Sequence, residues 1–542
     1  MKRSRRRLLL WATAVAMLLT GVLTRHPGVI IAQTATPKYG GTFVYSLGGE
    51  PAHLNPAITL SVLENQVGAA IFDVLVELNQ ELVPVPSLAE SWKISPDGLR
   101  YEFTLVDTRW HDGKPVTSED VKFTFEEALL KAHPRGAAQR DRIKSIETPT
   151  PRTVVFNLEA PFAPLIALLA VDARIIPKHI YSGGDIRNHP ANFKPIGSGP
   201  FRFVEWVKGS HVIVERNPNY FKPGKPYVDR IVYKITPESS SRVLALESGD
   251  VHYVSYYVLP SAEVERLRKN PDIVVSDKGA ESALGLLAVV INTQHPILGK
   301  KEVRQAIYYA IDRRVVNEKA DFNLGKVAAG PIPAAWKWAY NPEVAQKYPH
   351  NLARAAQLLD QAGLPKKADG IRFPVRMIVD RGIPLYVKGS EVVAQRLRDV
   401  GIAVQLQPVD RPTLLDRMYT KWDFDLNVHG FAAGPDPAIG VSRLYISDNR
   451  THAPFSNASG YGNPKVDELF KQAARTPRLE DRGRFYKEVQ SVLVEEAPLV
   501  WLTEYGTVSA WRKEMAGLHS WSADSMYAAP ADVWWTKGRE KP

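Results

Sequence analysis

The chain has 542 residues, of which 44% are hydrophobic and 23% charged, so it can bury a large core and form two or three domains. Its formal net charge is +11, but residues 1–36 hold six basic residues and no acidic ones, which leaves +5 for the rest of the chain. This moderate charge, without a Lys/Arg stripe that carries interleaved aromatic residues, excludes a nucleic-acid-binding protein.

The first 36 residues have the pattern of an export signal. Five Lys and Arg residues precede an apolar run from Leu8 to Leu23, and Ala32 stands at a plausible cleavage point. The basic stretch 4–9 also fits a twin-arginine signal, so Sec and twin-arginine export both stay open. An uncleaved N-terminal anchor is a third alternative, because the apolar run is marginal for a membrane span. The chain has no cysteine, so it lacks the residue that would receive a lipid anchor.

Residues 84–121 follow a first expected strand at 38–46 and have a strand–turn–helix pattern. The apolar residues within 101–105 alternate with polar ones, as on a strand with one buried face. Pro-Asp-Gly and His-Asp-Gly turns lie on either side of this strand. Thr117 stands three residues before Asp120, which predicts a capped helix start.

Three blocks in this stretch resemble the signature of a known family. They are LAESWKISPDG at 88–98, RWHDGKP at 109–115 and SEDVKF at 118–123. With these blocks the chain resembles the extracytoplasmic solute-binding proteins of ABC importers, family 5, which include dipeptide-, oligopeptide- and nickel-binding proteins. The glycine-rich turn and strands at 196–220 and the ALESGD segment at 245–250 extend the match.

The resemblance implies an α/β, two-lobed periplasmic-binding-protein-like fold (type II) with an extra subdomain inserted in the first lobe. It implies the following organisation: an export signal at 1–36, a first lobe at 37–283 with the inserted subdomain at about 58–195, a second lobe at 284–505, and a tail at 506–542 that returns to the first lobe.

The second half of the chain alternates strands and helices, which is typical of an α/β lobe. LGLLAVVINT at 284–293 predicts a continuous buried strand of the kind found in mostly parallel sheets. The apolar spacing of 301–316 predicts one helix. Further helices are expected at 352–362, 391–400 and 464–475, and further strands at 375–380 and 402–409.

No catalytic or metal-binding motif stands out. The sequence contains no Gly-x-Ser-x-Gly elbow, P-loop or His-Glu-x-x-His motif, and its 13 histidines form no i, i+4 pair on a predicted helix. His111 is interpreted as a turn or packing residue, because the family keeps its block across different ligands. We therefore predict a non-enzymatic protein with no cofactor and no metal site; an exported hydrolase or transferase is the alternative of another class.

The family resemblance implies a ligand site in the segment 423–440, which leads into Asp436-Pro437. Several peptide-binding relatives have an aspartate three residues before the acid of this pair, where it holds the α-ammonium group of the ligand. Here Ala433 stands at that position. Since a buried ammonium without a carboxylate is costly, either another acid replaces it or the ligand has no free amine at this point. Asp436 is a candidate ligand contact, with a helix-capping or loop-bracing role as the alternative.

Five further residues are candidate ligand contacts, and three of them have a structural alternative. Ser61 follows a first-lobe loop that lies near the ligand in relatives. Arg381 could pair with a ligand carboxylate, or be an exposed loop arginine. Trp422 and Phe431 could form apolar walls, or belong to the core, and His429 has no partner at metal-chelating spacing, so the sequence does not favour nickel.

These observations predict a periplasmic solute-binding component of an ABC importer that captures a peptide or peptide-like solute between its lobes. Its expected partners are the solute and a complex of ABC permease and ATPase, and it is expected to be a monomer. An opine, sugar or metal chelate is the alternative solute, and a receptor subunit for a membrane sensor would use the same fold.

Overall fold

The structure is a computed structural model that describes most of the chain. The described residues are 36–59, 61–79, 83–133, 136, 142–255, 258–277, 285–452, 455–518 and 530–537. The expected export signal, apart from its last residue, lies outside them, as do residues 519–529 and 538–542 of the expected tail. Among the described residues, no helix has the length and apolar character needed to cross a membrane.

A seven-stranded mixed sheet joins segments from both ends of the chain. Its strand order is β12 (Ile273–Ser276), β19 (Ser509–Arg512), β11 (Tyr253–Val254), β1 (Thr42–Leu47), β10 (Arg230–Ile235), β9 (His211–Arg216) and β8 (Phe201–Val207). β1 runs parallel to β10 and β11, whereas β19 runs antiparallel to β11 and β12. The chain beyond residue 508 therefore adds a strand to the sheet that begins at residue 42.

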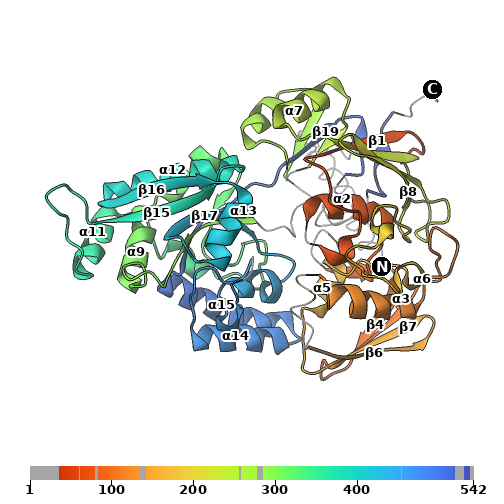
Figure 1. The fold of residues 1–542 in the computed structure, drawn as a ribbon, viewed down its shortest axis with the longest axis horizontal. Helices are drawn as coiled ribbons and strands as arrows, with labels where there is room; N and C mark the ends of the chain where they lie inside the picture. Colours follow the sequence, from red (N-terminus) through yellow and green to blue (C-terminus); the bar gives the residue numbers. More distant parts are fainter. Residues whose placement is uncertain are drawn as a thin grey trace, which may run out of the picture. The chain divides into compact units, whose positions relative to one another are not determined.

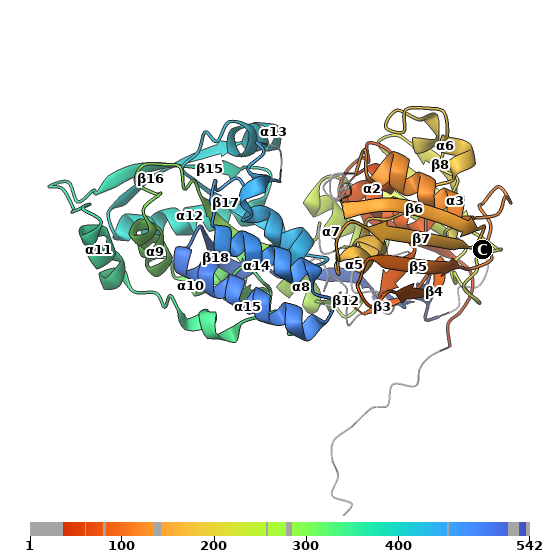
Figure 2. The same cartoon turned by 90° about the horizontal axis from the view of Figure 1, so that it is seen from below.

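A four-stranded antiparallel sheet is built from the segment between β1 and β8. Its order is β4 (Ala89–Ile94), β5 (Arg100–Leu105), β7 (Thr153–Leu158) and β6 (Ile143–Thr150), and Figure 2 shows the four strands in this order. The helices α3 (Ser118–Phe123), which continues as a π-turn over Thr124–Leu129, and α5 (Leu165–Val171) share its buried apolar core. We call the part of the chain built on these two sheets the first lobe.

The six-stranded sheet belongs to the second half of the chain, which we call the second lobe. Its order is β14 (Lys326–Val327), β18 (Leu499–Glu504), β13 (Gly285–Ile291), β17 (Leu426–Ala432), β15 (Phe373–Asp380) and β16 (Ile402–Val409). Its helices are α9 (Lys301–Ala310), α10 (Arg313–Asp321), α11 (Leu352–Gln361), α12 (Pro384–Asp399), α13 (Arg411–Leu415), α14 (Pro464–Arg475) and α15 (Leu479–Glu496). The other α-helices of the described residues are α2 (Val62–Ile71), α6 (Lys178–Tyr181), α7 (Ser239–Ser248) and α8 (Val264–Arg268), and they belong to the first lobe. Figure 1 shows β15, β16 and β17 beside α12.

Two expectations for the second lobe are wrong. β13 is buried along its whole length, as expected, but both of its neighbours, β17 and β18, run antiparallel to it. Core side chains cover both faces of β13, so the strand would be buried whether its neighbours ran parallel or antiparallel to it. The single helix expected over 301–316 is two helices, because Ile311 is extended and Asp312 caps α10 by accepting a hydrogen bond from the Arg314 N–H group.

Most local expectations are confirmed. β5 spans Arg100–Leu105, Gly98 in the preceding turn has φ +68°, and Thr117 and Asp120 form a capping box at the start of α3. The helices expected at 352–362 and 464–475 are α11 and α14, while the helix expected at 391–400 starts earlier, as α12. The lobe boundaries inferred from the family resemblance stay a prediction.

His111 has the packing role expected for it. Its Nδ1 atom accepts a hydrogen bond from the Gly197 N–H group at 3.2 Å, and its Nε2 atom lies 3.0 Å from the Gly199 carbonyl oxygen. Both glycines lie so close to Ile71 that a Cβ atom at either position would come within 2.7 Å of the Ile71 backbone. Burial lowers the pKa of His111 to about 4, so the ring is neutral at pH 7. It joins its own turn to the glycine turn at 197–199, which packs against the last residue of α2.

Candidate functional site

The carboxyl ends of three parallel strands lie at one edge of the second-lobe sheet. β15 runs parallel to both β16 and β17. Arg381 directly follows β15, and Ala433 directly follows β17. Ligands of open α/β sheets bind outside the carboxyl ends of the strands. This edge therefore brings Arg381 and the segment 433–436 to the place where a ligand site is expected.

Asp436 is engaged in a buried ion pair. Nη2 of Arg482, on α15, lies 2.7 Å and 2.9 Å from the two carboxylate oxygens. The same carboxylate accepts a hydrogen bond at 2.9 Å from the N–H group of Ala438 and so caps the short helix Pro437–Val441. Only 6% of Asp436 is exposed. These contacts favour the bracing role, and the ligand contact at Asp436 stays a prediction.

Arg482 holds this corner of the lobe together. Besides the pair with Asp436, its Nε atom donates to the carbonyl oxygen of Ala473 at 3.0 Å, and Nη2 lies 3.2 Å from the Tyr486 hydroxyl group. Its guanidinium group also lies 5.1 Å from the ring centre of Trp338. Burial lowers the pKa of Arg482, but the attraction to Asp436 outweighs it and holds the pKa above the ordinary value. Removal of one partner of such a pair costs about 3–5 kcal/mol.

Ala433 lies in a tightly folded stretch of the chain. It is 2% exposed, and a Cβ atom on Gly440 would come within 2.0 Å of its carbonyl oxygen. Its methyl side chain brings no charge to the end of β17, and the carboxylate that follows, at Asp436, is paired with Arg482. The structure thus offers no uncommitted acid between His429 and Pro437 to bind an ammonium group.

His429 and Phe431 point into the core of the second lobe. Both lie on β17, at 2% and 5% exposure, and their ring centres are 5.0 Å apart. The ring of Tyr386, from α12, lies 5.3 Å from that of His429. For Phe431 the core position is therefore favoured over an apolar wall of the site, and the ligand contacts of both residues stay predictions.

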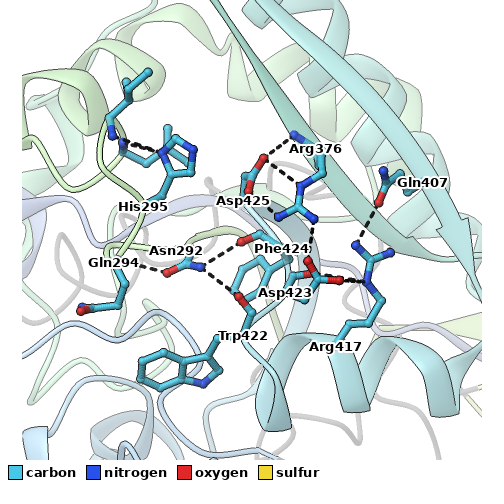
Figure 3. Close-up of polar contacts among 12 residues, drawn as sticks. Asn292, Gln294, His295, Arg376, Gln407, Arg417, Trp422, Asp423, Phe424 and Asp425 are labelled. Atoms are coloured by element: carbon cyan, nitrogen blue, oxygen red, sulfur yellow. Dashed lines mark hydrogen bonds and ion pairs between the residues drawn. The ribbon is translucent and has the colours of Figure 1, made fainter.

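Trp422 lies at the opposite end of β17 from Ala433. Figure 3 shows Asn292 donating hydrogen bonds to the carbonyl oxygens of Trp422 and Phe424, at 3.2 Å and 2.9 Å. The indole ring stacks on His452, with 4.3 Å between the ring centres. Since a strand rises about 3.3 Å per residue, the two ends of the seven-residue β17 are roughly 20 Å apart. Trp422 and Ala433 therefore do not share one site.

The amino end of β17 is fixed by a network of charged groups, which Figure 3 also shows. Arg376 of β15 donates to Asp425 at 2.9 Å and also pairs with Asp423. Arg417 binds Asp423 at 3.0 Å and Gln407 of β16 at 3.0 Å. These pairs join β15 and β16 to the chain at the start of β17.

Ser61 and Arg381 are the two exposed candidates. Ser61 stands at the start of α2, where its carbonyl oxygen accepts hydrogen bonds from Asn65. Arg381 lies beside Asp410 at the end of β16, and the Thr413 N–H group and the nearby Arg381 hold the pKa of Asp410 below its ordinary value. Both side chains are exposed at the surface of their lobe, and their ligand contacts stay predictions.

Arg482 is the site residue that the sequence analysis missed. It stands 46 positions after its partner Asp436, on a different element. A signal was present: an arginine four residues before Tyr486 on the buried face of α15 needs an acidic partner. Among the described residues, no cluster of three or more His, Asp or Glu side chains is arranged to hold a metal ion.

Comparisons with known proteins agree on one family. Residues 83–452 match the model of the bacterial extracellular solute-binding proteins, family 5. The chain is 27% identical to the oligopeptide-binding protein AppA of Bacillus subtilis over 92% of each chain, and 30% identical to the probable D,D-dipeptide-binding periplasmic protein DdpA of Escherichia coli over 90% of this chain and 92% of that one. The structure of AgaA from A. tumefaciens R10 in complex with agropinic acid superposes with a TM-score of 0.77 at 27% identity, covering 91% of this chain and 99% of AgaA.

Proposed function

This chain belongs to family 5 of the bacterial extracellular solute-binding proteins, and we propose that it captures a peptide or peptide-like solute between its two lobes for an ABC importer. The observation that carries the proposal is the similarity along nearly the whole chain to binding proteins for oligopeptides and dipeptides. The type II fold of these relatives has two lobes, and here two large sheets are built from different segments of the chain. The solute would then pass to a membrane complex of permease and ATPase.

Ser61 of the first lobe and Arg381 of the second are proposed to contact the solute. Both are exposed, and Arg381 lies at the sheet edge where three parallel strands end. An exposed guanidinium group at this edge suits a solute carboxylate, which it can bind through two hydrogen bonds. The α2 start beside Ser61 adds backbone N–H groups that favour a negatively charged or strongly polar solute group.

A solute whose amino group is blocked or absent is the second candidate. Ala433 supplies no carboxylate, and Asp436 is already paired with Arg482, so an ammonium group at the end of β17 would lose its hydration without gaining a partner. AgaA, with agropinic acid bound, shares 27% of the sequence. An opine or an N-blocked peptide therefore fits this end of the site better than a free dipeptide does.

Native mass spectrometry of the purified protein identifies a co-purified solute directly. Thermal shift then compares di- to pentapeptides with the same peptides after N-acetylation, since a ligand at 100 times its dissociation constant adds about 2.7 kcal/mol to the free energy of unfolding. Stabilisation by the free peptides supports the main proposal, and stabilisation by the N-acetylated series alone favours the second candidate. If neither series raises the melting temperature and an opine does, the peptide proposal is wrong and the second candidate holds.

The protein is further proposed to act outside the cytoplasm, as a monomer and without catalysis. The basic and apolar first 36 residues support export, and family 5 consists of solute-binding proteins. Cell fractionation tests the location, and size-exclusion chromatography with light scattering tests the monomer. Incubation with the peptides that bind, followed by mass spectrometry, should recover them uncleaved; a cleaved product would contradict the non-enzymatic proposal.

A further inference from the structure

The two lobes contact each other through the segment that precedes α5. The N–H group of Ala163, in the first lobe, donates a hydrogen bond at 2.9 Å to the carbonyl oxygen of Ala474, in the last turn of α14. This contact joins residues 311 positions apart, and it is not part of the two chain crossings between the lobes, which follow β12 and β18. It is therefore a separate junction between the lobes.

Two apolar side chains of the second lobe complete the junction. Ile439 and Ala474 belong to the buried core whose other members all lie between residues 75 and 175 of the first lobe. Each is 5% exposed, and Ala438 packs against the same core. Side chains of one lobe that are buried in the core of the other must lose this burial if the lobes separate, at a cost proportional to the apolar area exposed.

Arg482 aligns both contact residues. It binds Asp436, which caps the short helix that carries Ile439, and it binds the carbonyl oxygen of Ala473, next to Ala474. The Asp436 carboxylate and the Ala473 carbonyl oxygen lie on different elements. One guanidinium group therefore sets the spacing between these elements. The planar, multiply hydrogen-bonded geometry that this needs is specific to arginine, because a lysine ammonium group cannot bind all three acceptors in one plane.

We propose that Ile439 and Ala474 form an apolar latch that holds the lobes together and that Arg482 is its positioning residue. The proposal rests on the proposed function, since solute capture between lobes requires them to open and close. The latch favours the closed arrangement before any solute is bound, so that a solute spends less of its binding free energy on closure. It also lies at the end of the candidate site, because Ile439 follows Asp436 by three residues.

The absence of cysteine allows a direct test on solute-free protein. Spin labels on Lys93→Cys in the first lobe and Lys471→Cys in the second, both exposed positions, report the separation of the lobes by pulsed electron paramagnetic resonance. Ile439→Ala should shift the ratio of short to long separations at least about tenfold toward the long ones, because the substitution removes most of the buried side chain. Ile439→Val should keep most of the short population.

Matched variants separate the latch from general stability. Ile332→Ala removes an equally buried isoleucine within the second lobe, so it should lower the melting temperature and leave the separations unchanged. Arg482→Lys should lengthen the separations although Ile439 and Ala474 are intact. If Ile439→Ala lowers the melting temperature as Ile332→Ala does and leaves the separations unchanged, the contact is permanent and the latch is refuted. Since no solute is added, this outcome is independent of whether the proposed solutes bind.

Discussion

Asp321 should make the stability of this protein depend on pH near neutrality. It is the last residue of α10, it is 1% exposed, and its carboxylate accepts a hydrogen bond at 2.7 Å from the N–H group of Gly506, in the segment that joins β18 to β19. Burial raises the pKa of Asp321 to about 7, against the smaller opposing effect of hydrogen bonds from Gly506 and Gly325. The substitution Asp321→Asn keeps an oxygen acceptor and removes the titration.

The size of the change in the free energy of unfolding follows from the folded and the ordinary pKa of this carboxyl group. Between its ordinary pKa of 3.8 and its folded pKa of about 7, the folded state binds a proton that the unfolded state has released. The free energy of unfolding therefore falls as pH rises through this range and is constant above it. At about 1.4 kcal/mol for each pKa unit, the loss in the wild type is about 4 kcal/mol.

Urea unfolding of the wild type and Asp321→Asn at pH 4 to 9 measures this loss. The advantage of Asp321→Asn should be small at pH 4, grow to a few kcal/mol by pH 8, and then stay level. Asp250→Asn, at an exposed aspartate, is the control for the exchange of a carboxylate for an amide. If the difference between Asp321→Asn and the wild type is the same at every pH, burial does not raise the pKa of Asp321 and the reasoning is wrong.

Three further substitutions test the scaffold and the site. His111→Ala should lower the free energy of unfolding by about 1–3 kcal/mol, because two hydrogen bonds are lost. In the wild type, the lowered pKa of His111 makes the free energy of unfolding fall as pH falls from about 6.5 to 4, and the substitution should abolish this fall. Urea unfolding measures both effects. Gly199→Ala should lower the melting temperature by several degrees, because its Cβ atom would lie 2.7 Å from the Ile71 carbonyl group; an unchanged value would contradict the tight packing. Ala433→Asp should lower the melting temperature of the free protein and raise the thermal shift that free dipeptides produce, whereas Ala433→Asn should not raise that shift. An equal response of both variants would mean that position 433 does not face an ammonium group.

The turns and helix starts could be predicted from the sequence because the interactions that form them are local. The Thr117 N–H group donates to the Asp120 carboxylate at 2.8 Å, across three residues, and Asn463 caps α14 through the N–H group of Lys465. Where an apolar pattern fitted either one long helix or two shorter helices, the local sequence did not distinguish between them. The apolar face of 301–316 continues through Ile311, which is buried although the helix ends there, so periodicity alone did not reveal the break.

The candidate site could be predicted only in part. The sequence placed the candidates along β17 and at the ends of other elements, and two of them, Ser61 and Arg381, are exposed as a ligand contact requires. For Phe431 it left both an apolar wall of the site and the core open, and it did not predict that His429 also lies in the core, because the strand is buried along nearly its whole length. The sequence also did not predict that Trp422 lies far from Ala433, because this separation depends on the extended strand β17 between them.

The sequence by itself determined the family, the local caps and turns, and the lack of an acid at Ala433, since each depends on residue identities within a short stretch. Only the tertiary structure decided that Asp436 pairs with Arg482, that β13 has antiparallel neighbours and that Ala163 of one lobe bonds to Ala474 of the other. These contacts join segments from 46 to 311 residues apart. They form because whole sheets and helices pack against one another, and no short pattern in the chain carries that information.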